Sequence, residues 1–138
     1  MKRISAIDYG DARTGVAVSD LTGTLAGEAL TIQEWNAEKL AQRLAFFARE
    51  RDAEKFVLGL PKNMDGTEGP RAEKARQFKA LLEEASGLPV ILWDERRSTI
   101  EAHAILHAAG KKEKKHRANV DAVAATLLLE GYLASPNR

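Results

Sequence analysis

Acidic residues follow apolar runs at two widely separated places in this sequence, and a third acid opens an apolar helical segment. Asp8 ends one run, Asp94 and Glu95 end another, and Asp121 begins the segment. An ionised carboxylate at the end of a buried strand is costly unless a cation or several donors compensate it. Carboxylates gathered in one crevice repel one another, but Mg²⁺ or Mn²⁺ makes such a cluster favourable. Two such ions can activate water and stabilise the leaving oxygen of a phosphodiester, which is nuclease chemistry.

Each acid also has a purely structural explanation. Asp121 could be favoured by the dipole at a helix N-terminus, and Asp94 and Glu95 could be solvated strand ends or partners of the two arginines that follow. Asp8 could pair with Arg13 across a hairpin. The combination of the three places favours a metal site, and the spacing alone does not choose between Asp94 and Glu95.

Five predicted strands and four predicted helices would position these acids. Strands are expected over 4–7, 16–18, 24–32, 56–60 and 90–93, the last two as buried strands. Helices are expected from the N-cap Asn36, from Pro70 to Gly87, from a Ser98/Glu101 capping box to Gly110, and from the N-cap Asn119. This order predicts a mixed five-stranded α/β sheet with helices on both faces and a ligand site at the carboxyl ends of its strands.

The last helix is predicted to carry Asp121 in its first turn. Its inward-facing residues are expected to be Val120, Val123, Ala124, Leu127 and Leu128.

Length and composition predict one domain over residues 1–138, with a frayed tail at 135–138. The 21 basic and 20 acidic residues nearly balance, so a nucleic-acid-binding surface would have to be local. The absence of cysteine excludes disulfides and thiolate zinc sites. No apolar run is long enough for a signal peptide or a membrane span, so we expect a soluble cytoplasmic protein.

Basic and amide side chains near the predicted site are candidates for contacts with a phosphate backbone. The loops beside the acids contribute Arg13, Lys62, Asn63, Arg96 and Arg97, and the basic segment 111–118 contributes Lys111, Lys112, Lys114, Lys115 and Arg117. We expect this segment to be a mobile loop. It could be only a solvated loop, but its place directly before Asp121 favours substrate contact.

Four ordered motifs, within 8–20, 57–67, 94–102 and 120–125, carry a family resemblance over nearly the whole chain. They include Asp8-x-Gly10-x-x-Arg13-x-Gly15, Gly59-Leu60-Pro61-x-Asn63, Asp94-Glu95-Arg96-x-Ser98 and Val120-Asp121-Ala122. With these motifs the chain resembles the YqgF family, relatives of RuvC-type Holliday junction resolvases in the RNase H-like superfamily. The resemblance implies an RNase H-like fold in which Asp8, Glu95 and Asp121 are catalytic and bind Mg²⁺ or Mn²⁺, and it favours Glu95 over Asp94.

The leading hypothesis is a metal-dependent endonuclease that cuts structured nucleic acid. Two substrates have been proposed for the family, and the 5′ end of precursor 16S rRNA is ranked first. The other is the four-way DNA junction, whose symmetric cutting would need two active sites and hence a homodimer. A non-catalytic RNA-binding or ribosome-assembly module is the alternative of another class. An actin-like phosphotransferase is disfavoured because 138 residues supply one lobe where two are needed.

Overall fold

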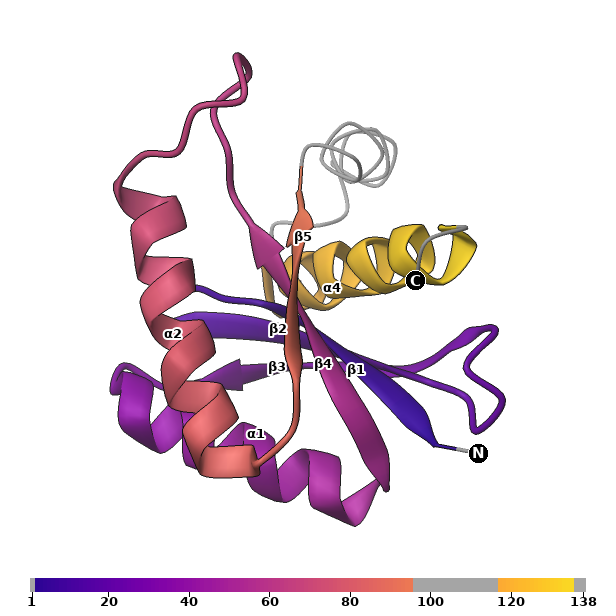
Figure 1. Cartoon of the computed structure of the whole chain (residues 1–138). Helices are drawn as coiled ribbons and strands as arrows, with labels where there is room; N and C mark the ends of the chain where they lie inside the picture. The colour runs from indigo at the N-terminus through magenta and orange to yellow at the C-terminus, as the bar shows by residue number, and fades with distance from the viewer. Residues whose placement is uncertain (1, 96–116, 136–138) are drawn as a thin grey trace.

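A computed structural model describes residues 2–95 and 117–135 of the chain (Figure 1). The predicted helix beginning at the Ser98/Glu101 capping box, and residues 111–116 of the basic segment, lie outside the described residues. The strands are β1 (Arg3–Asp8), β2 (Arg13–Ser19), β3 (Ala26–Gln33), β4 (Ala53–Leu60) and β5 (Val90–Asp94). They form one sheet in the order β3-β2-β1-β4-β5, in which β1, β4 and β5 are parallel and β2 and β3 antiparallel. The predicted mixed five-stranded sheet is confirmed.

Helices cover both faces of this sheet. Helices α1 (Ala37–Glu50) and α2 (Pro70–Ser86) pack on one face, and α4 (Arg117–Ala134) packs on the other (Figure 1). Side chains alternate along β1, so Ile7 enters the core under α1 and α2, whereas Ile4 and Ala6 enter the core under α4. Asp8 follows Ala6 in this alternation and belongs to the α4 face.

Local signals in the sequence define the first two helices. Asn36 caps α1 by accepting a hydrogen bond from the Lys39 amide at 2.9 Å, as predicted. Pro70 is the first residue of α2, where its missing N–H costs nothing. Gly87 ends α2 with φ of 70°, a left-handed conformation that glycine adopts without strain.

Strand β5 lies at the edge of the sheet. Of its apolar residues only Val90 is buried, while Ile91, Leu92 and Trp93 are half-buried. The prediction of a fully buried strand is therefore wrong for β5, because among the described strands it pairs with β4 alone.

Helix α4 differs from the prediction in its start and in its buried stripe. It begins at Arg117, so Asn119 is not its N-cap and Asp121 lies beyond its first turn. Arginine and alanine are good helix formers, and they extend the helix past the residue that resembles a cap.

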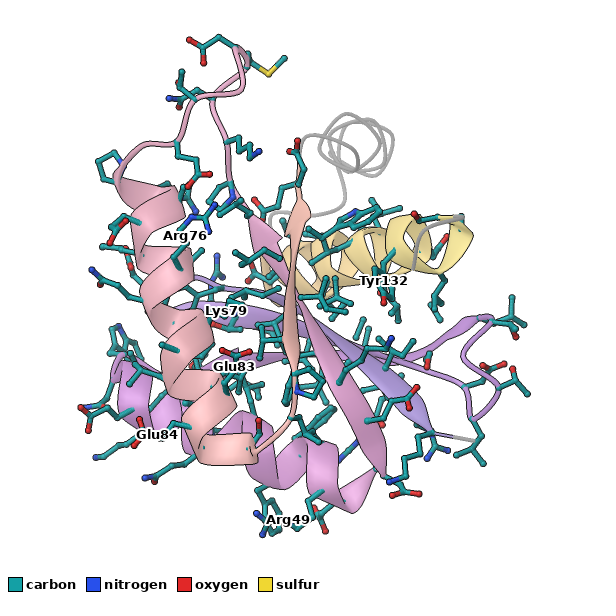
Figure 2. The ribbon with its side chains drawn as sticks, in the orientation of Figure 1. Arg49, Arg76, Lys79, Glu83, Glu84 and Tyr132 are labelled. Carbon is teal, nitrogen blue, oxygen red and sulfur yellow. The ribbon has the colours of Figure 1, made fainter. Side chains whose placement is uncertain are left out.

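The residues of α4 that pack on the sheet are Ala125, Leu128, Leu129 and Tyr132 (Figure 2 labels Tyr132). Val120, Val123 and Ala124 are only half-buried, so the predicted stripe is right for Leu127 and Leu128 alone. An almost continuously apolar helix gives no clear phase in its pattern. No helix in the described ranges combines the length and the apolarity needed to cross a membrane.

Candidate active site

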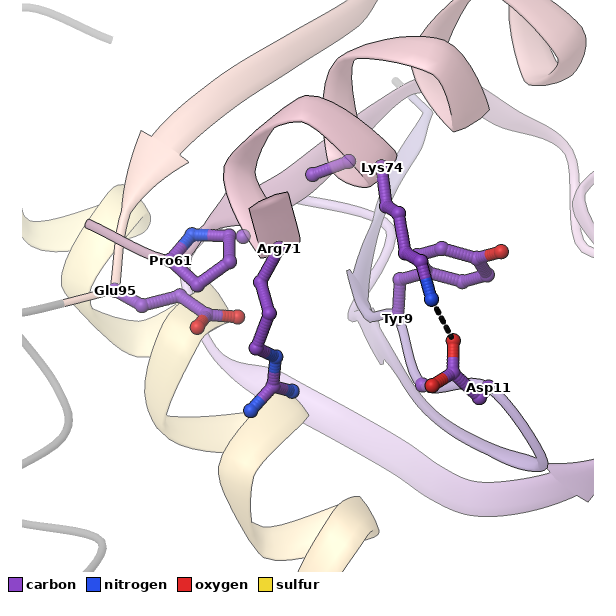
Figure 3. A pocket seen from close by; sticks show the side chains of 9 residues that line it. Tyr9, Asp11, Pro61, Arg71, Lys74 and Glu95 are labelled. Carbon is purple, nitrogen blue, oxygen red and sulfur yellow. Dashed lines mark hydrogen bonds and ion pairs between the residues drawn. The ribbon is translucent and has the colours of Figure 1, made fainter. Parts of the chain in front are cut away.

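The parallel strands β1 and β5 deliver two of the predicted acids to the same edge of the sheet. Asp8 ends β1, and Glu95 follows β5, where its amide donates to the Leu60 carbonyl at 3.2 Å. Figure 3 shows Glu95 just beyond the end of β5. The Glu95 side chain lies against Gly59, where a Cβ atom would overlap its carboxyl group. The glycine therefore leaves room for the acid.

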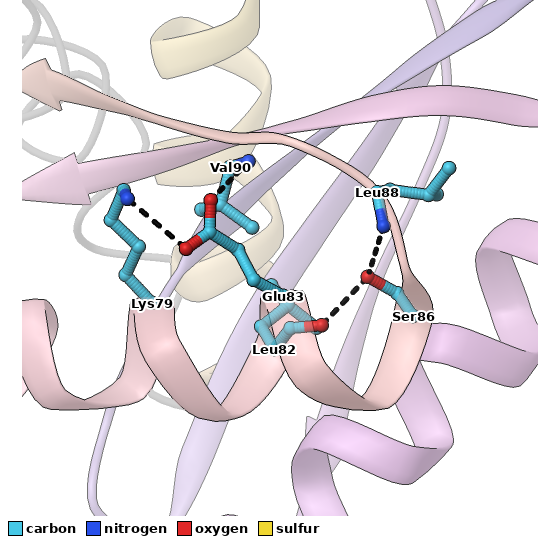
Figure 4. A network of polar contacts seen from close by, with 6 residues as sticks. All are labelled: Lys79, Leu82, Glu83, Ser86, Leu88 and Val90. Carbon is cyan, nitrogen blue, oxygen red and sulfur yellow. Dashed lines mark hydrogen bonds and ion pairs between the residues drawn. The ribbon is translucent and has the colours of Figure 1, made fainter.

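Polar contacts at the end of α2 hold the start of β5 (Figure 4). Glu83 accepts a hydrogen bond from the Val90 amide at 3.4 Å and pairs with Lys79 at 3.1 Å. The Ser86 hydroxyl donates to the Leu82 carbonyl at 2.6 Å and accepts from the Leu88 amide. These contacts fix where β5 begins and hence where Glu95 emerges from it.

Asp8 and Glu95 share a hydrogen bond between their carboxyl groups. Burial raises the pKa of Glu95 from 4.5 to about 8, with the neighbouring Asp8 charge adding to the shift. Burial also raises the pKa of Asp8, while the hydrogen bond with Glu95 opposes that rise. Glu95 is therefore the protonated partner, and its carboxyl O–H donates the hydrogen bond to Asp8. Two buried carboxyl groups that share a proton form a site ready to accept a cation instead.

Alternation along β5 separates Asp94 from Glu95. Ile91 and Trp93 pack toward α4, and Glu95 continues that series toward Asp8. Asp94 follows Leu92, which packs toward α2. The geometry of the strand thus points to Glu95 as the partner of Asp8, a distinction that spacing alone did not make.

Helix α4 brings Asp121 to the same face. Asp121 precedes Ala125 by one turn, so it continues the sheet-facing stripe of the helix. Gly15 pairs with Asp8 across the β1–β2 hairpin, and a Cβ atom at Gly15 would overlap the Asp121 carbonyl oxygen. The helix therefore lies directly on the sheet at the residue beside Asp8.

Arg13 pairs with Asp121 rather than with Asp8. Its Nε lies 3.5 Å from Asp121 Oδ2, a buried oxygen that has no hydrogen bond among the described residues. Burial raises the pKa of Asp121, and the charge of Arg13 opposes that rise. Because Asp121 lies past the first turn of α4, the helix dipole does not explain its presence.

Next to these acids is a cavity of about 330 Å³, lined by Tyr9, Gly10, Asp11, Gly59, Pro61, Arg71, Lys74, Ala75 and Glu95 (Figure 3). Arg71 is close enough to lower the pKa of both Asp8 and Glu95. Sequence reasoning missed Arg71 and Lys74. For Arg71 the available signal was a basic residue directly after a helix-starting proline, in the helix that follows a central strand.

Of the other predicted nucleic-acid-binding residues, the structure describes Lys62, Asn63 and the backbone of Arg117. Lys62 forms an isolated backbone bridge with Glu68, and Asn63 donates to Thr67 Oγ1 at 2.9 Å within its own loop. Neither lines the cavity. Arg117 begins α4, but its side chain is not described. Outside the described residues lie Arg96, Arg97, Lys111, Lys112, Lys114 and Lys115.

Within residues 2–95 and 117–135, no group of three or more histidine, cysteine, aspartate and glutamate residues is arranged to hold a metal ion. Asp8 and Glu95 bond to each other, while Asp121 pairs with Arg13. The three acids nevertheless occupy one face of the sheet and come from three separate elements.

The sheet order and the two-sided helix cover define an RNase H-like fold of the RuvC type. RuvC of Thermus thermophilus, solved in complex with a Holliday junction substrate, superposes with a TM-score of 0.63 over 98% of both chains at 12% identity. The Fowlpox virus resolvase, solved with substrate Holliday junction DNA, gives a TM-score of 0.58 over 95% of this chain and 96% of that one at 16% identity. At these identities the likeness establishes the fold.

Sequence comparison establishes the family. A sequence model of the RuvX family, described as a Holliday junction resolvase, matches residues 2–135. A protein of Halothermothrix orenii is 42% identical over 99% of this chain and 97% of its own length. A protein of Bacillus subtilis is 40% identical over 98% of this chain and 99% of its own length. Both are named "Putative pre-16S rRNA nuclease". The chain belongs to the RuvX family, which confirms the YqgF resemblance, and it is a hydrolase of the nuclease class.

Proposed function

We propose that this protein is a metal-dependent endonuclease that processes the 5′ end of precursor 16S rRNA, with Asp8, Glu95 and Asp121 as its catalytic acids. The observation that carries the proposal is the buried Asp8–Glu95 carboxyl pair at the ends of two parallel strands. Burying such a pair lowers the stability of the fold, and an amide or an apolar residue would fill the same space at a smaller cost. The names of the relatives from Halothermothrix orenii and Bacillus subtilis supply the substrate.

The donor set fits a hard divalent cation such as Mg²⁺ or Mn²⁺. It consists of carboxyl groups, including the buried Asp121 Oδ2 without a hydrogen bond among the described residues. When bound, two divalent ions would supply the charge that activates water and stabilises the leaving oxygen. Binding requires Glu95 to lose its proton, so we expect metal affinity to increase with pH up to about 8.

The chain's own residues would do the remaining work. Asp8 and Glu95 would hold metal at the strand ends, and Asp121 would complete the site from α4. Arg13 would keep the Asp121 carboxylate ionised and contact the substrate backbone. A backbone-directed surface suits RNA, because A-form helices are recognised largely through shape, phosphates and 2′-hydroxyls.

Cutting of four-way DNA junctions is the second candidate function. The description of the RuvX family and the RuvC-like fold favour it. Symmetric cutting would require a homodimer that presents two active sites. A protein that stays monomeric with a junction bound would eliminate this candidate.

The decisive experiment compares cleavage of a labelled precursor 16S rRNA and a labelled four-way DNA junction, each with Mg²⁺ or Mn²⁺. Wild type and Asp8→Asn are assayed side by side, because asparagine keeps the size of the side chain and removes its charge. We expect metal-dependent cutting of the RNA that falls by about 10³-fold or more in the variant. Equal cutting by both proteins would show that Asp8 is not part of the catalytic centre, and binding without cutting would leave a non-catalytic RNA-binding module.

A further inference from the structure

The first turn of α2 forms one wall of the cavity beside the acids, and its charge is opposite to theirs. Arg71 and Lys74 both line the cavity from this turn and the next, while Glu95 lines it from the end of β5 and Asp11 from the β1–β2 hairpin (Figure 3). The cavity volume of about 330 Å³ is at the lower end of the range for small-ligand sites. The cavity is therefore large enough for a phosphate with part of its sugar.

The position of Arg71 is not explained by the stability of the helix. A cation at a helix N-terminus opposes the helix dipole, and Arg71 follows Pro70 directly. Arg71 is exposed and forms no ion pair or side-chain hydrogen bond with any residue in the described ranges. Its planar guanidinium, with several N–H donors, suits bidentate binding of a phosphate.

Two further features of the same wall favour an anion. The N-cap of α2 is Gly69, which has no side chain to bond the free amides of the first turn. Lys74 Nζ lies 3.2 Å from Asp11 Oδ1, in a pair whose side chains are 57% and 78% exposed. Such an exposed pair contributes little to stability, so Lys74 can exchange Asp11 for a stronger anion at little cost.

The part of the cavity wall formed by Tyr9 is continuous with the acids. Tyr9, the residue after Asp8, stacks on Phe78 of α2 with ring centroids 4.3 Å apart and planes 5° apart. The cavity thus adjoins the Asp8–Glu95 carboxyl pair. When one phosphate of a nucleic-acid strand lies at these acids, a neighbouring phosphate of that strand can reach the cavity.

We propose that this cavity is a subsite for a backbone phosphate of the substrate strand, adjacent to the phosphate that is cut. Arg71 is its main ligand, and Lys74 and the free amides of α2 assist. The inference rests on the proposed nuclease function for the identity of the anion, a phosphodiester of RNA or DNA.

The test measures binding in the Asp8→Asn background, so that cleavage does not interfere. A labelled precursor 16S rRNA fragment and a labelled four-way DNA junction are titrated at several salt concentrations with Arg71→Gln and with Arg49→Gln. Arg49 is the matched control, since it is an exposed arginine on α1 that does not line the cavity (Figure 2). Both variants change the net charge of the chain equally.

We expect Arg71→Gln to weaken binding of the true substrate about 5- to 50-fold at low salt and to reduce the slope of log K against log salt by about one. Arg49→Gln should change affinity less than about twofold, and Arg71→Lys should restore part of the loss. The arm in which the difference is larger identifies RNA or DNA as the source of the phosphate.

Equal effects of Arg71→Gln and Arg49→Gln, or an unchanged salt slope in both arms, would overturn the subsite. Its failure is distinguishable from failure of the proposed function. A wild-type protein that cuts neither substrate, but whose Arg71→Gln variant still binds selectively less, would keep the phosphate subsite and lose the catalytic proposal. A wild-type protein that cuts while Arg71→Gln binds like the control would do the reverse.

Discussion

The two faces of the sheet are built from different kinds of residue. The face under α1 and α2 buries large side chains, among them Leu40, Leu44, Phe47, Phe56, Phe78 and Leu82. On the α4 face β1 and β2 contribute the small residues Ala6, Gly15 and Ala17, beside the larger Ile4 and, from β4, Val57. Bulky residues separate a helix from a sheet, whereas small ones let it approach closely. The first face therefore serves stability, and the second places the backbone of α4, with Asp121, beside Asp8.

Because of this difference, the short strand β1 contributes both to the stability of the fold and to the candidate active site. In β1, Ile7 is fully buried against α1 and α2, while its neighbour Asp8 belongs to the site on the other face. Changes on the two faces should consequently separate stability from activity.

Among the changes that test the difference between the two faces, Gly15→Ala should have the largest effect on activity. The added methyl group would overlap the Asp121 carbonyl and push α4 away from the sheet. We expect activity to fall about 100-fold, because an active-site displacement of about 1 Å has that effect, and stability to fall by about 1–3 kcal/mol. Cleavage assays and urea unfolding measure the two quantities.

Gly131→Ala is the matched control for Gly15→Ala, since it places the same methyl group on α4 itself. The nearest atom to its Cβ would be Trp93 Nε1 at 3.5 Å, an ordinary contact. Stability should rise by about 0.5–1 kcal/mol from helix propensity, with activity unchanged. Equal activity of the Gly15 and Gly131 variants would contradict the close approach that we describe.

Leu44→Ala and Leu128→Ala compare the faces directly. Both side chains are at most 2% exposed, so each truncation should lower the unfolding free energy by about 2–5 kcal/mol. Leu44 belongs to α1, on the opposite face of the sheet from the three candidate catalytic acids, whereas Leu128 shares its stripe on α4 with Asp121. Turnover measured well below the melting temperature should fall only for Leu128→Ala. A similar loss of turnover in both variants would show that the faces are not independent.

Glu95→Gln should change how stability depends on pH in the presence of a chelator. The pKa of Glu95 is about 8 when folded and 4.5 as an ordinary glutamate, so between these values the folded protein binds the extra proton. Stability from this group is therefore fully present below pH 4.5 and is lost as pH rises toward 8, by roughly 2–4 kcal/mol.

Glutamine cannot ionise, yet its amide can still donate to Asp8, so unfolding of Glu95→Gln by urea at several pH values should show a flatter profile. Glu84→Gln, an exposed substitution on α2, is the control and should keep the wild-type profile (Figure 2 labels Glu84). Parallel profiles for wild type and Glu95→Gln would show that Glu95 does not carry the proton.

Arg13→Gln should have the smallest effect on stability. The side chains of Arg13 and Asp121 are 35% and 20% exposed and 3.5 Å apart, and such a pair contributes at most about 1 kcal/mol. The charge of Arg13 lowers the pKa of Asp121, so its removal should move the acid limb of the activity profile to higher pH. The pH dependence of kcat/KM measures this shift, and an acid limb that stays in place or moves to lower pH would refute it.

Local chemistry in the sequence was sufficient for most of the fold. Asn36, Pro70 and Gly87 act on their own neighbours, so the helix boundaries that depend on them were predicted correctly. Helix α4 was misjudged because its apolar residues occur on nearly every side. Only packing against Ala6 and Ala17 selects Ala125, Leu128, Leu129 and Tyr132 as its inner face.

The sequence by itself determined which acids are candidates for the site, since apolar patterns and the family motifs together identify Asp8, Glu95 and Asp121. Only the tertiary structure decided their partners: Glu95 bonds to Asp8, Arg13 turns to Asp121, and Arg71 joins the site from α2. The physical reason is the distance along the chain over which each interaction acts. Capping and alternation act over a few residues, whereas charge partners are fixed by the register of β1 with β5 through β4 and by the approach of α4 at Gly15.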